Sequence, residues 1–287
     1  MMETIIEKCD QFVDMQVWPI EPAIRPQLWL SNFHDSEREY AINLLNSFYF
    51  FNEKMCRQLL ITAFRSISYK FRNDSGKPLR QEWQEFCKTC IFTYPDHKPT
   101  GSGNNVLTQA RKSLGFDESK FYSPNDALAA IYDDKSQNLV FVDDFIGSGT
   151  QFTETWTDLY PRRRQHMSYT TAFSRENRRA FYIPLVATEY GITEIFKTCN
   201  DIEILPAHIL PENYNAAIEN SKIWPENLKS DALNFLKNAS KRAGYEEGWA
   251  GFKELGLTIA FYNSIPDATL PLFYSDRNGW KPLMERS

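Results

Sequence analysis

One stretch constrains this chain more than any other: LVFVDDFIGSGTQF, residues 139–152. It opens with four apolar residues of β-branched and aromatic type, a pattern typical of a strand buried on both faces of a parallel sheet. Two aspartates, Asp143 and Asp144, follow this run directly, and a loop of small residues comes soon after. Ligands of parallel α/β sheets bind beyond the carboxyl ends of the strands, so the stretch predicts a binding site.

The loop after the aspartates is suited to a phosphate group. Its small residues let backbone N–H groups approach an anion, and the helix that follows adds positive potential at its N-terminus. Carboxylates accept hydrogen bonds from ribose hydroxyls. The stretch therefore predicts contacts to a phosphate at one end and to a sugar at the other. A solvated strand end beside a tight turn is the alternative interpretation.

Two other phosphate motifs fit the stretch poorly. A Walker A loop requires a lysine before its last hydroxyl residue, and none is present here. A dinucleotide-binding fingerprint requires a third glycine, where Phe152 stands.

Further apolar runs predict the rest of a sheet. Short strands are expected at residues 91–94 and 182–188, and another apolar run covers residues 202–210. Helical patterns separate these runs. Alternation of strands and helices predicts an α/β fold with a mainly parallel, doubly wound sheet.

The N-terminal third is predicted to be helical. Apolar residues recur at helical spacing from residue 36 to Phe51, and Ser123 or Asn125 is a candidate cap for a later helix. We expect three regions: a helical region packed on the core at 1–90, the α/β core at 91–230, and a C-terminal helix with an aromatic tail at 231–287.

Composition narrows the class of protein. The chain has 287 residues, of which 42% are hydrophobic, so it can bury a substantial core. A net charge of −5 argues against a generally basic nucleic-acid-binding protein. No apolar run approaches a membrane span, no secretory signal is evident, and five cysteines are few. We therefore expect a cytoplasmic protein without membrane contact.

The segment LVFVDDFIGSGT resembles the phosphoribosyl-pyrophosphate binding motif of type I phosphoribosyltransferases. The resemblance implies the fold of that family, with a C-terminal hood, and a pentosyl-transferring enzyme. It implies that Asp143 and Asp144 are catalytic, contact the ribose 2- and 3-hydroxyls, and meet Mg²⁺ indirectly through its other ligands. It also implies a 5-phosphate site formed by Gly147, Ser148, Gly149, Thr150 and Gln151. This chain departs from the family at Gln151, where the family has a threonine.

A wider resemblance covers most of the chain. The helical N-terminal third, YIPLVATEYGITEI and TLPLFYSDRNGWKPL resemble a branch of that family found in bacterial conflict systems, including effectors encoded beside retron reverse transcriptases. This implies a toxin effector in anti-phage defence. The implied partners are a reverse transcriptase with its nucleic acid, or another defence protein. An oligomer is compatible with the sequence, which does not determine the number of subunits.

Two further segments carry candidate residues. In the family, an earlier loop grips the pyrophosphate; the counterpart here contains Lys98, Ser102 and Gly103, with a flexible surface loop as the alternative. Residues 161–179 hold one glutamate and six arginines, which could dock nucleic acid or an acidic partner. The alternative is a solvated loop between a helix and a strand. The six are Arg162, Arg163, Arg164, Arg175, Arg178 and Arg179.

Three functions remain open from the sequence. The first is a Mg²⁺-dependent phosphoribosyltransferase that uses phosphoribosyl pyrophosphate or a related nucleotide. The second is a catalytically silent sensor or assembly subunit that binds a partner through the segment from Arg162 to Arg179. The third is a nucleotide hydrolase that transfers the ribosyl group to water.

Overall fold

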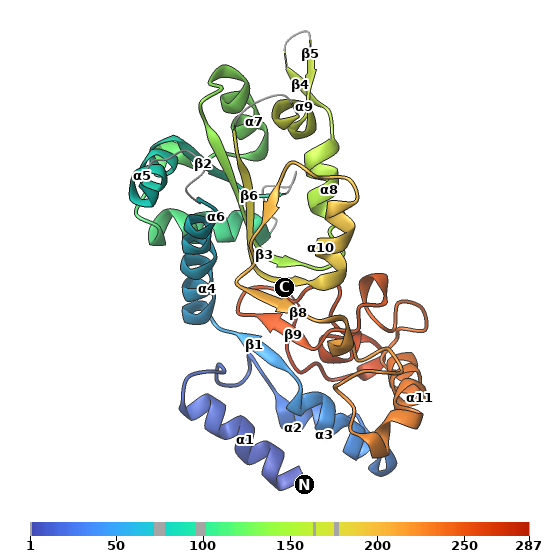
Figure 1. Ribbon diagram of the computed structural model, residues 1–287. Helices are drawn as coiled ribbons and strands as arrows, with labels where there is room; N and C mark the ends of the chain where they lie inside the picture. Colours follow the sequence, from blue (N-terminus) through green and yellow to red (C-terminus); the bar gives the residue numbers. More distant parts are fainter. Residues whose placement is uncertain (1, 72–77, 96–101, 163–164, 175–177, 287) are drawn as a thin grey trace. The chain divides into compact units, whose positions relative to one another are not determined.

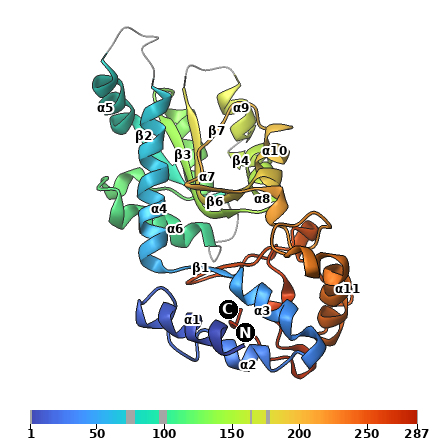
Figure 2. The same ribbon diagram turned by 60° about the horizontal axis from the view of Figure 1, so that its bottom comes forward.

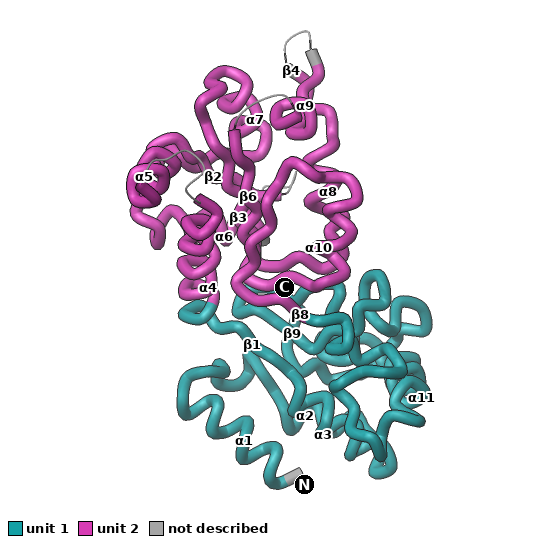
Figure 3. The backbone as a smooth tube through the Cα atoms, viewed as in Figure 1, with its two compact units in different colours: residues 1–55, 211–287 teal, residues 56–210 magenta. Residues whose placement is uncertain are grey.

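The computed structural model describes residues 2–71, 78–95, 102–162, 165–174 and 178–286 (Figure 1). Two compact units divide the chain (Figure 3). Unit 1 combines Met1–Met55 with Pro211–Ser287, and unit 2 is Cys56–Leu210. These bounds differ from the sequence-based division at residues 90 and 230.

Unit 2 contains a parallel sheet of strand order β2-β3-β6-β7, with β8 also pairing with β6. The two long strands are buried along nearly their whole length, as continuous apolar runs predict. The expected parallel sheet is thus confirmed. Its strands are β2 (Cys90–Thr93), β3 (Asn138–Ile146), β6 (Ala180–Thr188), β7 (Glu203–Ile204) and β8 (His208–Leu210).

Helices cover both faces of this sheet, as a doubly wound fold requires (Figures 1 and 2). On one face, the ring centroids of Phe64 on α4 and Phe92 on β2 lie 5.7 Å apart. The ring centroids of Phe86 on α5 and Phe181 on β6 lie 5.4 Å apart. On the other face, one core joins side chains of α7, α8, α9 and α10 to the sheet. The helices are α4 (Glu53–Ser66), α5 (Leu79–Thr89), α6 (Ser102–Ser113), α7 (Pro124–Asp133), α8 (Thr150–Thr157), α9 (Tyr169–Phe173) and α10 (Glu189–Phe196).

Aromatic packing explains why residues 56–90 belong to unit 2. The rings of α4 and α5 fill the space over β2 and β6, so these helices share their core with the sheet. Of the two candidate caps for the helix predicted at 127–134, Ser123 is confirmed: its Oγ accepts a hydrogen bond from the Asp126 N–H in the first turn of α7. A short antiparallel hairpin, β4 (Tyr160–Arg162) and β5 (Gln165–Met167), follows α8.

A proline interrupts the sheet on one side of β6. The Pro184 carbonyl accepts a hydrogen bond from the Ala207 N–H, and the Tyr182 carbonyl accepts one from the Leu205 N–H. In a parallel ladder one residue's N–H and C=O point to the same neighbour, so the N–H that Pro184 lacks would have faced this side. The apolar run at 202–210 consequently forms two short strands, β7 and β8, instead of one.

Unit 1 is built from both ends of the chain. One hydrophobic core includes residues from Ile5 to Phe50 and from Ala216 to Leu283. Trp29 is completely buried, stacks on Phe273 at 5.3 Å, and donates a hydrogen bond from Nε1 to the Leu272 carbonyl. The helices are α1 (Met2–Asp14), α2 (Pro26–Leu30), α3 (Arg38–Asn46) and α11 (Glu226–Arg242).

The helix predicted to reach Phe51 is too long. Helix α3 ends at Asn46, and β1 (Tyr49–Phe51) pairs in parallel with β9 (Ile259–Phe261). Phe51 stacks on Phe261 at 5.1 Å. Residues 49–51 continue the helical spacing of apolar residues but form a strand. Their partner strand lies near the other end of the chain, and local periodicity carries no information about it.

Short 3₁₀ turns complete the secondary structure. They are Asp35–Glu37, Ile67–Lys70, Glu118–Lys120, Glu212–Tyr214, Phe252–Glu254, Pro271–Phe273 and Arg277–Gly279. Among the described residues, no helix combines the length and apolar character needed to cross a membrane.

We expect Trp29→Ala to lower the free energy of unfolding by about 3–5 kcal/mol, because it removes a buried indole and leaves a cavity. Leu28→Ala in the same helix is the control, since Leu28 is 38% exposed; its cost should stay below about 1 kcal/mol. Urea unfolding of both variants measures the difference. Equal costs would contradict the central place of Trp29 in this core.

Candidate functional site

Strand β3 carries both aspartates of the central stretch into the protein interior. The strand continues past Val142 to Ile146. Asp143 and Asp144 therefore lie within the C-terminal half of the strand and not beyond its end. Their side chains are only 3% and 6% exposed. A solvated strand end, the alternative interpretation from the sequence, does not describe this position.

Asp143 is held on both carboxyl oxygens. Tyr182 of β6 donates its hydroxyl to Oδ2 at 2.7 Å, and the Asp144 N–H donates to Oδ1 at 3.0 Å. The Tyr182 ring is 1% exposed and stacks on Phe152 of α8 at 4.3 Å. The tyrosine is thereby fixed from one side by the strand and from the other by the helix that follows the loop.

Burial dominates the electrostatics of Asp143. It raises the pKa of Asp143 well above its ordinary value, and the neighbouring charge of Asp144 raises it further. The hydrogen bond from Tyr182 acts in the opposite direction and is the weaker effect. Burial, together with Asp143, also raises the pKa of Tyr182 well above its ordinary value, so Tyr182 keeps its proton and acts as a donor.

The loop between β3 and α8 has a left-handed residue at its end. Gly149 adopts φ 76° and occupies the N-cap position of α8. Ser148 Oγ and Thr150 Oγ1 share a hydrogen bond of 2.9 Å, and Thr150 is exposed. The loop therefore places two hydroxyl groups beside the N-terminal N–H groups of a helix, an arrangement that favours anions.

The first turn of α10 braces this loop. Thr188 Oγ1 donates to the Gly147 carbonyl at 2.5 Å and accepts a hydrogen bond from the Gly191 N–H at 2.9 Å. A Cβ at Gly191 would overlap the Gly147 carbonyl oxygen, and a Cβ at Gly149 would lie 2.7 Å from the Gly191 carbonyl oxygen. Two glycines thus let the loop and the helix touch backbone to backbone.

Sequence reasoning did not identify Thr188 and Gly191 as site residues. The local signal was present, because a threonine that ends a strand and precedes a helix is a typical N-cap. Its contact with Gly147 depends on the pairing of β3 with β6.

Gln151 has a partner of its own within the fold. Its Nε2 donates to the Pro95 carbonyl at 2.6 Å, which ties the start of α8 to the segment after β2. The side chain that stands in place of the family's threonine is thus bonded to the protein's own backbone, although the residue is exposed. The expected role of Gln151 at a phosphate remains a prediction.

The start of α6 also approaches β3. A Cβ at Gly103 would lie 3.5 Å from Asp143 Oδ1 and 3.0 Å from the Tyr94 Cβ, so a larger residue would crowd this point. The structure brings Gly103, Asp143 and Gln151 toward the same end of the sheet. Ser102 is the first residue of α6, but its side chain and all of Lys98 lie outside the described residues.

The arginine segment is only partly described. Arg163, Arg164 and Arg175 lie outside the described residues, as does the side chain of Arg162. Arg178 Nη1 donates to the Ile131 carbonyl at 2.7 Å.

Arg179 is engaged more extensively. Its Nε donates to Glu203 at 3.2 Å, and its guanidinium lies over the rings of Phe71 and Phe181 at 4.7 and 4.9 Å. Arg178 and Arg179 therefore support the fold, and a role for the segment in partner binding remains a prediction.

Metal-binding capacity at the site is limited. Across the part of the chain that the structure describes, no three His, Cys, Asp or Glu side chains lie close enough to hold a metal ion. Two buried carboxylates suit an ion that takes most of its ligands from a bound phosphate compound and from water, as Mg²⁺ does.

Comparison with known proteins gives one family match. Residues 26–286 match the family model described as PRTase-CE. The matched range includes β3, the loop, α8 and α10, whereas α1 lies outside it. None of the curated proteins matches the chain.

Two glycines of nearly equal φ allow the contribution of the contact between this loop and α10 to the free energy of unfolding to be measured. Gly149 has φ 76° and packs against α10, whereas Gly115 has φ 75° and open space around it. We expect Gly115→Ala to cost about 1–2 kcal/mol of unfolding free energy, the strain of a left-handed alanine. Gly149→Ala should cost more, because its Cβ also meets Gly191 and Ile195. Equal costs in urea unfolding would contradict the close approach.

The raised pKa of Asp143 predicts how stability depends on pH. The folded state binds this proton more tightly than the unfolded state, so the contribution to stability is full below about pH 3.9 and falls as pH rises toward the folded pKa. Asp143→Asn should therefore lose less stability than the wild type when pH is raised from about 4 to 8. Urea unfolding without ligand tests this.

Tyr182→Phe is the companion variant. It removes a hydrogen bond that lowers the pKa of Asp143, so its decline in stability should extend to higher pH than that of the wild type. If the free energy of unfolding of the wild type, Asp143→Asn and Tyr182→Phe changed equally with pH, Asp143 would not titrate as its burial implies.

Proposed function

Because the chain belongs to the PRTase-CE family, a phosphoribosyltransferase-type family, we propose that it binds phosphoribosyl pyrophosphate or a related nucleotide at the end of β3. One observation carries the proposal: a buried aspartate pair leads directly into a glycine loop that caps α8 and is braced by Thr188 and Gly191. The family match supports a phosphoribosyltransferase-like function.

The loop supplies the groups that a 5-phosphate needs. The first N–H groups of α8 have no partner within that helix and favour an anion, as does the helix dipole. The hydroxyls of Ser148 and Thr150 can turn from each other toward phosphate oxygens, because a hydroxyl both donates and accepts. The backbone contact at Gly191 holds the loop in shape before the ligand arrives.

The aspartate pair suits the ribose. Each oxygen of Asp143 accepts one hydrogen bond from the protein, and a carboxylate oxygen has a second lone pair for a ribose hydroxyl. Tyr182 sets the carboxyl orientation before binding, so less freedom is lost when the sugar binds. Asp144 is the second acceptor in this proposal.

The proposed reaction is a displacement at C1 of the ribose. A lone pair of the acceptor forms the new bond to C1, and the bond from C1 to pyrophosphate breaks with its electron pair going to the leaving pyrophosphate. Mg²⁺ bound to the pyrophosphate would neutralise part of its charge. The side chains at the loop hold the 5-phosphate and thereby fix C1 relative to the acceptor.

A second candidate, binding without turnover, is favoured by Gln151. This residue stands in place of the family's threonine, and its side chain is engaged with the Pro95 carbonyl. The protein would then keep the site as a sensor or assembly subunit. A third possibility from the sequence, transfer of the ribosyl group to water, uses the same aspartates and differs only in the acceptor.

The biological setting is proposed from resemblance alone. A toxin effector in anti-phage defence, with a reverse transcriptase and its nucleic acid or another defence protein as partner, is the setting implied by the wider sequence resemblance. The acceptor for the ribosyl group is part of the same open proposal.

Calorimetric titration of phosphoribosyl pyrophosphate with Mg²⁺ into the full chain tests the site. We expect the wild type to bind and the variant Asp143→Asn/Asp144→Asn to bind at least about tenfold more weakly, a loss of about 1.4 kcal/mol or more. Asp201→Asn, an exposed aspartate of the same unit, serves as the matched control and should bind like the wild type. Equal affinity of the double variant would refute the proposed site.

Phosphorus NMR of the same mixtures separates the three functions. Pyrophosphate that appears only when an acceptor is added indicates transfer. Pyrophosphate together with ribose 5-phosphate, without any acceptor, indicates transfer to water; with a nucleotide as the substrate, the same transfer would give ribose 5-phosphate and the free base. An intact ligand that still binds in the titration indicates the sensor function.

A further inference from the structure

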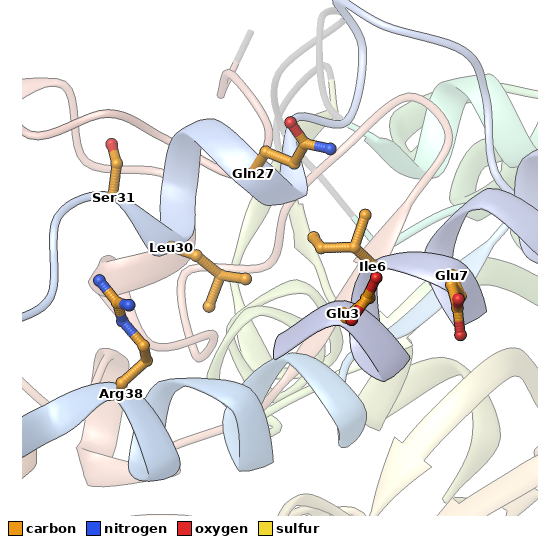
Figure 4. Close-up of a pocket in the computed structure, with 7 residues that line it drawn as sticks. All are labelled: Glu3, Ile6, Glu7, Gln27, Leu30, Ser31 and Arg38. Atoms are coloured by element: carbon orange, nitrogen blue, oxygen red, sulfur yellow. The ribbon is translucent and has the colours of Figure 1, made fainter. Parts of the chain in front are cut away.

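Unit 1 contains a pocket that the proposed function does not use. Its volume is about 590 Å³, within the range of small-molecule sites. Three helices line it: α1 with Glu3, Ile6 and Glu7, α2 with Gln27, Leu30 and Ser31, and α3 with Arg38 (Figure 4).

The pocket has two oppositely charged ends (Figure 4). Glu3 and Glu7 lie at one end, and Arg38 lies at the other, on the same side as Ser31. Lys281 adds a second positive charge beside Ser31, because its Nζ donates to Ser31 Oγ at 3.3 Å. The side chains of Leu30 and Ile6 lie between the two ends and provide an apolar wall.

The negative end lacks a cation from the described residues. Glu3 and Glu7 stand one helix turn apart on α1, where like charges repel each other. Among the ion pairs formed within the described ranges, none includes either glutamate. A ligand cation between these two carboxylates would relieve their repulsion.

The positive end is partly open to a ligand. The Arg38 side chain is 41% exposed, although its Nε atom is buried. The Nη2 group pairs with Asp35 at 3.1 Å, but Asp35 is 94% exposed, and such an exposed pair is weak. A carboxylate bound here could displace Asp35 and pair with the accessible end of the Arg38 guanidinium.

We propose that this pocket binds a small zwitterion with an apolar middle, of the amino-acid or short-peptide class. The ligand's ammonium group contacts Glu3 and Glu7, its carboxylate contacts Arg38, and its aliphatic part packs on Leu30 and Ile6. The family match begins at residue 26, so the wall formed by α1 is an addition to the matched domain. The residues of α2 and α3 that line the pocket lie within the matched range, and none of the lining residues belongs to the proposed nucleotide site.

Three related probes test each end of the pocket separately in the full chain. Leucyl-leucine carries both charges, N-acetyl-leucyl-leucine lacks the ammonium group, and leucyl-leucinamide lacks the carboxylate. We expect the zwitterion to bind at least about tenfold more tightly than either capped probe, measured by titration calorimetry or by NMR shifts.

Charge variants assign the two ends. Arg38→Gln should remove the advantage of the zwitterion over leucyl-leucinamide, and Glu3→Gln/Glu7→Gln should remove its advantage over the acetylated probe. Glu53→Gln and Lys54→Gln change the same charges at exposed positions of α4 outside the pocket and should leave both advantages intact. Circular dichroism confirms that each variant is folded.

Three results would overturn the proposal. They are equal affinity for the zwitterion and both capped probes, equal losses in the pocket and control variants, or no binding of apolar dipeptides up to about 10 mM. Titration of phosphoribosyl pyrophosphate into the same variants is a separate readout, so failure at this pocket leaves the nucleotide site unaffected.

Discussion

Parallel pairing of β3 with β6 is the interaction on which the candidate site depends. The register Phe141↔Tyr182 places the tyrosine hydroxyl beside Asp143, and the register Ile146↔Ala187 places Thr188 beside Gly147. A shift by one residue would turn every side chain to the opposite face. One ladder of backbone hydrogen bonds therefore orients a carboxyl group and also shapes a loop.

The aspartate pair is retained against a desolvation penalty. Burial in the sheet interior, together with the neighbouring charge of Asp144, raises the pKa of Asp143, whereas an apolar residue in that position would carry no such penalty. Perturbed groups of this kind cluster at functional sites. The surrounding fold offsets the penalty through the aromatic core of Phe141, Phe152 and Tyr182, whose rings pack against one another.

Local patterns predicted much of the fold but misplaced several residues. The buried strands and the cap at Ser123 were predictable, because each depends on residues close together in the chain. Phe51 was assigned to a helix because its strand partner lies at the other end of the chain. The parts played by Gln151 and Arg179 were not predictable, since their partners, Pro95 and Glu203, are distant in the sequence.

The sequence by itself determined a parallel α/β sheet and an aspartate pair that leads into a glycine loop, because burial periodicity and small residues act within one segment. The tertiary structure alone decided what surrounds that segment: the hydroxyl of Tyr182, the brace from Thr188 and Gly191, and the bond from Gln151. These contacts join segments far apart in the chain. They follow from strand register and helix packing, which no single segment encodes.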